Sequence, residues 1–188
     1  MDRKIIIAIV LTVTLVVAAG AYLVMREGEE PVGITAMEGV NKASEYINNT
    51  YGNGTLIHVQ SMAFIEDGYS VGWSYNYLIF NNDTNEFQII DVNVFNNGTI
   101  TPFYYSGNGS SYGVIKDWSI DSNEAYQISM NIAEIQDFKL YIMVLTGGID
   151  CPTWHIYYIH TEIMDNPRGA DITINATSGE ILNIEIHN

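Results

Sequence analysis

An unbroken apolar run at residues 5–25, with no charged side chain, is the first pattern along the chain. As a helix rising 1.5 Å per residue, this run would be about 31 Å long, which matches the ~30 Å hydrocarbon core of a bilayer. The pattern therefore predicts a transmembrane anchor. A cleaved signal peptide is the alternative, because residues 19–21 have the small-x-small form of a cleavage site. The apolar run continues beyond that point, which favours retention.

Charges on either side of the run indicate its orientation. Arg3 and Lys4 precede it, and Glu27 follows it closely. Positive residues are retained on the cytoplasmic side of a membrane. We therefore expect a single-pass protein of the cell membrane, with a cytoplasmic N-terminus and an extracytoplasmic C-terminal part. The membrane is then one partner of the chain, through residues 5–25.

After the anchor, the spacing of apolar residues changes from a helical to a strand period. Thr35 and Glu38 form a capping box, which predicts the start of a helix. Apolar positions recur at helical spacing as far as residue 47 or so. Alternating apolar and polar residues then predict strands at 55–65, 71–80 and 86–95.

The same order of elements returns later in the chain. Residues 121–124 form a second capping signal, and apolar residues at helical spacing continue to residue 135. Alternation again follows the helix, and it predicts strands at 139–145, 153–161, 170–176 and 180–186. The two halves of the chain therefore share one sequence of predicted elements.

Two tryptophan–glycine spacings support an internal repeat. Trp73 and Gly98 are 25 residues apart, and so are Trp154 and Gly179. Each glycine ends a polar turn signal, so we expect Gly98 and Gly179 to form equivalent structural turns. The predicted organisation is a cytoplasmic stub, an anchor, a tether, a first repeat, a linker and a second repeat, at residues 1–4, 5–25, 26–34, 35–101, 102–120 and 121–188.

The predicted fold class is α+β. An N-terminal transmembrane helix would be followed by two tandem units, each a helix packed on an antiparallel meander. The two meanders could join edge to edge into one sheet with both helices on the same side. The opposite face of such a sheet would stay open for binding.

Charge and cysteine content narrow the classes of partner and fold. Twenty-two acidic residues against seven basic ones give a net charge of −15. This excludes a nucleic-acid partner, because neutralising phosphate requires lysine and arginine. The single cysteine, Cys151, excludes a disulfide within the chain.

Catalytic and metal-binding motifs are missing from the sequence. It contains no nucleophile elbow, phosphate-binding loop or zinc-protease motif. His155 and His160 lie five residues apart on one predicted strand, so they point to opposite faces and do not share a metal. Residues 81–86 superficially resemble a calcium loop, but Glu86 stands where the loop requires glycine. We expect no enzymatic activity, no cofactor and no metal site.

Aromatic side chains are the best candidates for a binding surface. They cluster on two predicted strands and at the start of the linker, and they are Trp73, Tyr75, Tyr77, Tyr104, Tyr105, Trp154 and Tyr158. Outward-facing aromatics are typical of protein-binding hot spots. The alternative is that the strand aromatics form the core beneath the helices.

Six asparagines stand in Asn-x-Ser/Thr triplets, at Asn48, Asn53, Asn82, Asn97, Asn108 and Asn175. Most of them lie in stretches rich in glycine or asparagine, where a glycan would not disturb packing. They are acceptors if the host glycosylates exported asparagines. The alternative is that they simply form turns.

The C-terminal half resembles the PepSY domain family. Trp154-His155-Ile156-Tyr157, followed by the hairpin sequence at residues 170–182, matches the family's tryptophan strand and its V-D-A-x-T-G-E-V-type hairpin. Asn175 stands where the family usually has aspartate, and Ser178 where it usually has threonine. The resemblance covers residues 121–188, and it reaches 35–105 only through the repeat. It implies regulation or inhibition of peptidases and supplies no catalytic residue.

These patterns lead to one functional hypothesis and one alternative. The hypothesis is a non-catalytic, envelope-anchored interaction module that binds a protein, such as a peptidase that it regulates, through its open sheet. The alternative is a surface glycoprotein that binds sugars or small ligands, which the tyrosine-rich linker and the Asn-x-Ser/Thr triplets would suit.

Overall fold

The computed structural model describes residues 33–62, 65–82, 84–105, 113–148, 150–159 and 169–187. The expected cytoplasmic stub and the anchor at 5–25 lie outside these ranges, as does most of the tether. Within the described ranges, no helix is long and apolar enough to cross a membrane. Residues 33–188 form one compact unit.

Strand is the dominant element of this unit. The helices are α2 (Ala36–Tyr51), α3 (Ser122–Ser129) and the short 3-10 helix η2 (Ala133–Ile135). The strands are β1 (Thr55–Ser61), β2 (Ile65–Glu66), β3 (Tyr69–Ser70), β4 (Gly72–Asn81), β5 (Glu86–Phe95), β6 (Ile100–Tyr105), β7 (Lys139–Thr146), β8 (Thr153–Ile159), β9 (Gly169–Asn175) and β10 (Ile181–His187). Strand β6 extends into residues 102–105, which the sequence assigned to a linker.

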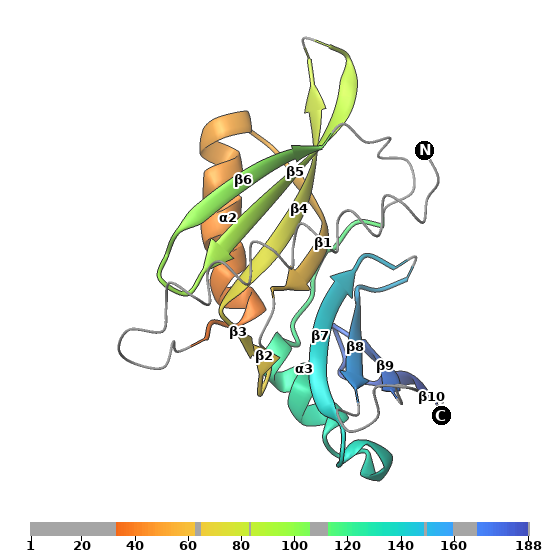
Figure 1. The fold of residues 1–188 in the computed structure, drawn as a ribbon. Helices are drawn as coiled ribbons and strands as arrows, with labels where there is room; N and C mark the ends of the chain where they lie inside the picture. Colours follow the sequence, from red (N-terminus) through yellow and green to blue (C-terminus); the bar gives the residue numbers. More distant parts are fainter. Residues whose placement is uncertain are drawn as a thin grey trace. The chain divides into compact units, whose positions relative to one another are not determined.

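Eight strands form one continuous antiparallel sheet in the order β10-β9-β8-β7-β1-β4-β5-β6 (Figure 1). Strands β1 and β7 join its two halves, with Val59 opposite Leu145 at the centre. The predicted fold class, a transmembrane helix followed by two helix-plus-meander units, is therefore corrected to a mainly β unit built on one sheet. The physical reason is that β1 and β7 would each leave a row of unpaired backbone groups, which their pairing satisfies.

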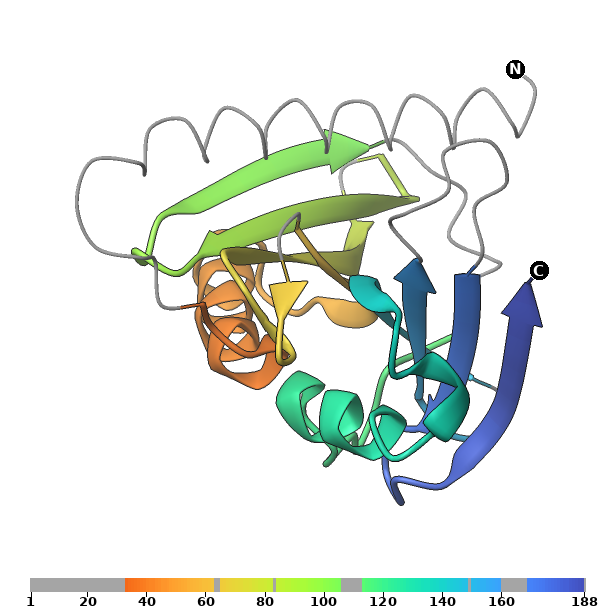
Figure 2. The ribbon, with the colours of Figure 1, turned by 60° about the horizontal axis from the view of Figure 1, so that its bottom comes forward.

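Both α-helices cover the same face of the sheet (Figure 2). On β4, Trp73 and Tyr75 point toward the helices, and their neighbours Val59 on β1 and Val92 on β5 do the same. Because side chains alternate along a strand, the intervening residues point to the other face. We call that second face the open face, since no described helix lies on it.

Residues at the start of α3 also cap the N-terminus of α2. Thr35 and Asp121 each complete a capping box at the start of their own helix. In addition, Ser122 Oγ accepts a hydrogen bond from the Ala36 backbone N–H at 3.0 Å, and Asp121 Oδ1 accepts one from the Met37 N–H, also at 3.0 Å. The Asp121 carboxylate therefore lies at the positive ends of two helix dipoles.

The two tryptophans of the spaced pairs occupy matching positions. Nε1 of Trp73 donates to the Ile34 carbonyl at 2.8 Å, and Nε1 of Trp154 donates to the Ile120 carbonyl at 2.8 Å. Each carbonyl belongs to the residue before a helix N-cap. The two rings pack edge to face, with centroids 6.0 Å apart, so they join the two halves of the core.

Candidate functional site

Most of the aromatic residues expected at a binding surface lie in the core. Their exposed fractions are 0% for Trp73, 0% for Tyr75, 3% for Tyr77, 0% for Trp154 and 2% for Tyr158. They occupy the helix-covered face, where a partner cannot reach them. These five rings therefore lie in the core beneath the helices, which was the alternative interpretation of the strand aromatics.

The buried tyrosine hydroxyls attach the helices to the sheet. Tyr75 donates to the Ala36 carbonyl at 2.7 Å. The hydroxyl of Tyr77 is hydrogen-bonded to Ser44 of α2, and that of Tyr158 to Ser129 of α3. Burial raises the pKa of both Tyr77 and Tyr158 to about 12, because a phenolate would lose its hydration there. These hydroxyls therefore have a structural role.

Of the seven aromatic residues predicted to form a binding surface, Tyr104 has an accessible ring. It lies on edge strand β6, is 65% exposed and accepts a hydrogen bond from the Tyr51 hydroxyl at 2.7 Å. The backbone of Tyr105 pairs with that of Ile89. The side chain of Tyr105 is outside the part that the structure describes. Tyr104 alone is a narrow basis for a binding surface.

A second accessible aromatic group lies on the β4–β5 hairpin. Pairing of β1 with β4 begins at Leu78, and pairing of β6 with β5 ends at Ile89, so the hairpin projects beyond both neighbours. We call residues 79–82 and 84–88 the hairpin arm (Figure 1). Phe80 and Phe87 lie opposite each other on it, with ring centroids 5.2 Å apart, and are 44% and 52% exposed.

The hairpin arm has the features of an interaction site. Its two phenylalanines lie on the open face, because Phe80 alternates with the buried Ile79. An edge-to-face aromatic pair is rigid and costs little conformational entropy when a partner covers it. Alternation along the predicted strand at 71–80 places Ile79 on one face and Phe80 on the other, so the sequence contained this signal. The projection of the arm could be seen only in the structure.

Polar side chains cross the centre of the open face. Asp91 on β5, Asn76 on β4 and His58 on β1 are consecutive cross-strand partners. Asp91 accepts a short hydrogen bond from Ser74 Oγ at 2.6 Å. Burial raises the pKa of Asp91 to about 6, and the Ser74 hydrogen bond opposes that change. Among the described residues, the buried Oδ1 of Asn76 finds no hydrogen-bond donor.

Two histidines of this face are mainly structural. Burial lowers the pKa of both His58 and His155, so each is chiefly neutral at pH 7. His58 is hydrogen-bonded to Gln60 at 3.4 Å, and His155 to Thr146 at 3.1 Å. The part of the chain that the structure describes thus contains no histidine paired with a serine or cysteine nucleophile.

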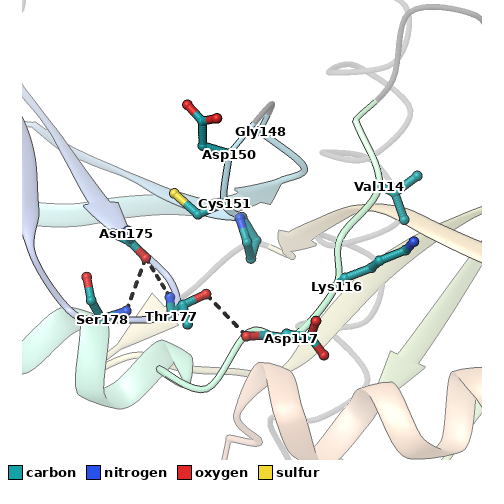
Figure 3. Close-up of a pocket in the computed structure, with 10 residues that line it drawn as sticks. Val114, Lys116, Asp117, Gly148, Asp150, Cys151, Asn175, Thr177 and Ser178 are labelled. Carbon is teal, nitrogen blue, oxygen red and sulfur yellow. Dashed lines mark hydrogen bonds between the residues drawn. The ribbon is translucent and has the colours of Figure 1, made fainter.

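The single cysteine borders an open hollow of about 680 Å³ (Figure 3). Its lining residues are Val114, Lys116, Asp117, Gly148, Asp150, Cys151, Pro152, Asn175, Thr177 and Ser178. Figure 3 shows Val114 and Lys116 across the hollow from Asp150 and Cys151. His155 Nε2 is hydrogen-bonded to Thr146, and among the described residues no hydrogen bond joins His155 to the thiol.

The turn glycines and the Asn-x-Ser/Thr asparagines lie mainly at the surface. Gly98 and Gly179 adopt positive φ values of 83° and 76°. Asn48, Asn53, Asn82 and Asn97 are exposed, and Asn108 lies outside the described residues. Asn175 is half-buried, and its Oδ1 accepts hydrogen bonds from the backbone N–H groups of Thr177 and Ser178. Asn175 therefore holds the turn that precedes β10.

Comparisons with known proteins bear on the fold. No family model matches the sequence, and no curated protein matches it. The fold is similar to the crystal structure of a putative lipoprotein from Clostridium difficile 630, with a TM-score of 0.55 and 10% sequence identity. The match covers 87% of this chain and 98% of that one. At this identity the likeness concerns the fold alone.

Proposed function

We propose that this protein is a non-catalytic, membrane-associated, extracytoplasmic module that binds a protein partner through its hairpin arm. The observation that carries the proposal is the exposed Phe80–Phe87 pair on a hairpin that projects beyond the sheet. Contiguous exposed aromatics on a projecting element are typical of protein-binding surfaces. An apolar pocket on the partner would cover the two rings.

Three observations support the proposed location. The sequence has an apolar run at residues 5–25 that is long enough to span a bilayer. A protein of similar fold is described as a putative lipoprotein. A net charge of −15 also suits a domain that stays in solution next to a membrane with anionic headgroups.

A peptidase or its precursor is the partner class that we propose to test first. This part of the proposal rests on the PepSY resemblance of residues 121–188. The non-catalytic part rests on the arrangement of the open face, where His58 and His155 are hydrogen-bonded to Gln60 and Thr146, and His187 is hydrogen-bonded to Asp171. Sugar binding is the alternative, and it becomes the next hypothesis if no protein is retained.

The proposal can be tested by affinity capture with matched variants. The full chain, held in detergent, would be exposed to native envelope solubilised in the same detergent. Retained proteins would be quantified by mass spectrometry against a denatured-bait control. The test variant is Phe80→Ser combined with Phe87→Ser, and the control is Tyr104→Ser, which alters an exposed ring on the helix-covered side of β6.

Enrichment of one peptidase or precursor by the wild type and Tyr104→Ser, with loss in the phenylalanine variant, is the expected result. Enrichment that the phenylalanine variant retains would show that the arm is not the binding element. Retention of no protein above the denatured control would contradict a stable protein partner. Circular dichroism of each variant would establish that the fold is intact.

A further inference from the structure

Three potential metal ligands converge on the β9–β10 hairpin. Asp171 on β9, Glu185 on β10 and His187 on β10 each offer one ligand atom, and these atoms all lie within 4.8 Å of one another. One pair, His187 Nε2 and Asp171 Oδ2, is 3.2 Å apart. A tetrahedral zinc ion with ligands at about 2.0 Å holds its ligand atoms about 3.3 Å apart. The observed pair therefore already has the spacing of two ligands on one ion.

Strand register places the three side chains on one face. Asp171 and Glu185 are directly opposite each other on neighbouring antiparallel strands. Glu185 and His187 are two residues apart on β10, so their side chains project to the same side. Tyr157 of β8 is the partner of Asp171 on its other side, where it borders the cluster. A regular hairpin thus presents the ligands, and only side-chain rotations are needed to bring them together.

The charges of this cluster favour a cation. Like charges directly opposite each other on paired strands are destabilising. Asp171 and Glu185 form such a pair, and among the described residues no lysine or arginine makes an ion pair with either of them. His187 is the basic group that contacts Asp171. A bound divalent ion would neutralise both carboxylates at once.

The donor set indicates the class of ion. Calcium and magnesium are usually held by oxygen ligands alone, whereas an imidazole nitrogen with carboxylate oxygens suits zinc and related transition metals. The side chains of Asp171 and His187 are 39% and 49% exposed. Three protein ligands on an accessible surface leave at least one coordination position for water or for a group from another molecule.

We propose that Asp171, Glu185 and His187 form a surface site for one divalent transition-metal ion of the zinc type. This proposal differs from the expectation of no metal site, which considered histidine pairs along a single strand. The site is on edge strand β10 and its neighbour, whereas the hairpin arm is on β4 and β5 near the other edge of the sheet. It therefore stands independently of the proposed function.

The test is a titration of the untagged full chain, held in detergent, with zinc. Isothermal titration calorimetry would measure the binding. Variants Asp171→Asn and His187→Gln remove one ligand each with little change in size. His58→Gln is the matched control, because it removes a histidine of the same face that lies on β1 and is hydrogen-bonded to Gln60. A parallel titration with Co²⁺ would report coordination through its visible absorption spectrum.

We expect one zinc ion per chain, and dissociation constants for Asp171→Asn and His187→Gln raised at least about tenfold. The His58→Gln variant should bind zinc as the wild type does. Absence of 1:1 binding by the wild type would overturn the proposal, as would unchanged affinity in both ligand variants. An equal loss of zinc affinity in His58→Gln would overturn it too, since the loss would then not be specific to the proposed ligands. Thermal unfolding without metal would verify that each variant is folded.

Discussion

Replacing Asp91 with asparagine should make the protein more stable at neutral pH. Asp91 is largely buried on the open face, and burial raises its pKa from the ordinary 3.8 to about 6. A pKa that is higher by one corresponds to about 1.4 kcal/mol, so ionising Asp91 in the folded state costs about 3 kcal/mol relative to the unfolded chain. Asparagine keeps an acceptor for the Ser74 hydroxyl and carries no charge.

A second effect in the same direction comes from Asn76. Its Oδ1 is buried and, among the described residues, has no donor. Asn76 is the cross-strand partner of Asp91, and such pairs have Cβ atoms about 5 Å apart. The amide N–H of an asparagine at position 91 could therefore donate to Asn76, which the ionised carboxylate cannot do.

The sign of the pH dependence follows from the raised pKa. The stability that neutral Asp91 contributes is fully present below about pH 3.8 and is lost as the pH rises through 6. The free energy of unfolding of Asp91→Asn should exceed that of the wild type by about 1–3 kcal/mol at pH 8. The difference should shrink toward zero at pH 4.

Urea unfolding of the full chain in detergent, followed by tryptophan fluorescence at several pH values, would measure this difference. The control is Asp137→Asn, which removes the same charge from an exposed turn. It shows how removing one exposed carboxylate by itself changes the free energy of unfolding at each pH. A difference in the free energy of unfolding between Asp91→Asn and the wild type that stays constant from pH 4 to 8 would refute the reasoning. A variant less stable than the wild type at pH 8 would refute it too.

Four further substitutions test the shared helix cap, the packing and a turn by the same unfolding assay. Asp121→Ala should lower the free energy of unfolding by about 2 kcal/mol or more, since the carboxylate caps both helices. A change near zero would contradict the shared cap. Gly39→Ala should destabilise by about 1–3 kcal/mol despite the better helix propensity of alanine, because its Cβ would lie 2.2 Å from the buried Tyr75 hydroxyl; a more stable variant would contradict that contact. Gly179→Ala should lower the free energy of unfolding by about 1 kcal/mol because φ is +76°. Gly54→Ala, where φ is not positive, should instead lose stability through close contacts with Ile47 and Tyr77.

Much of the local structure could be read from the sequence because its causes are local. The capping signals at Thr35 and Asp121 begin the two α-helices where they were predicted. Alternation placed β5 at its observed bounds, Glu86–Phe95, and the other long strands within a few residues. Both kinds of signal depend on residues close in sequence, so neighbouring side chains and backbone groups are enough to set them.

The second predicted helix and the linker show where local signals were insufficient. Apolar periodicity continued to residue 135, but α3 ends at Ser129 and a short 3-10 helix follows. Residues 113–120, assigned to a linker, contact the sheet: the Ile115 N–H donates to the Leu56 carbonyl, and the Ser119 N–H to the Ala176 carbonyl. These contacts are with segments far away in the sequence, so no local pattern predicts them.

What the sequence by itself determined is where the two α-helices start, most of the long strands, the acidic charge and the lack of recognisable catalytic motifs. The tertiary structure alone decided that β1 pairs with β7, because strand edges carry the same backbone groups and do not specify their partner. It also decided that Trp73 and Trp154 lie beneath the helices while Phe80 and Phe87 remain accessible. A strand's alternation defines two faces, but only packing determines which of them is covered.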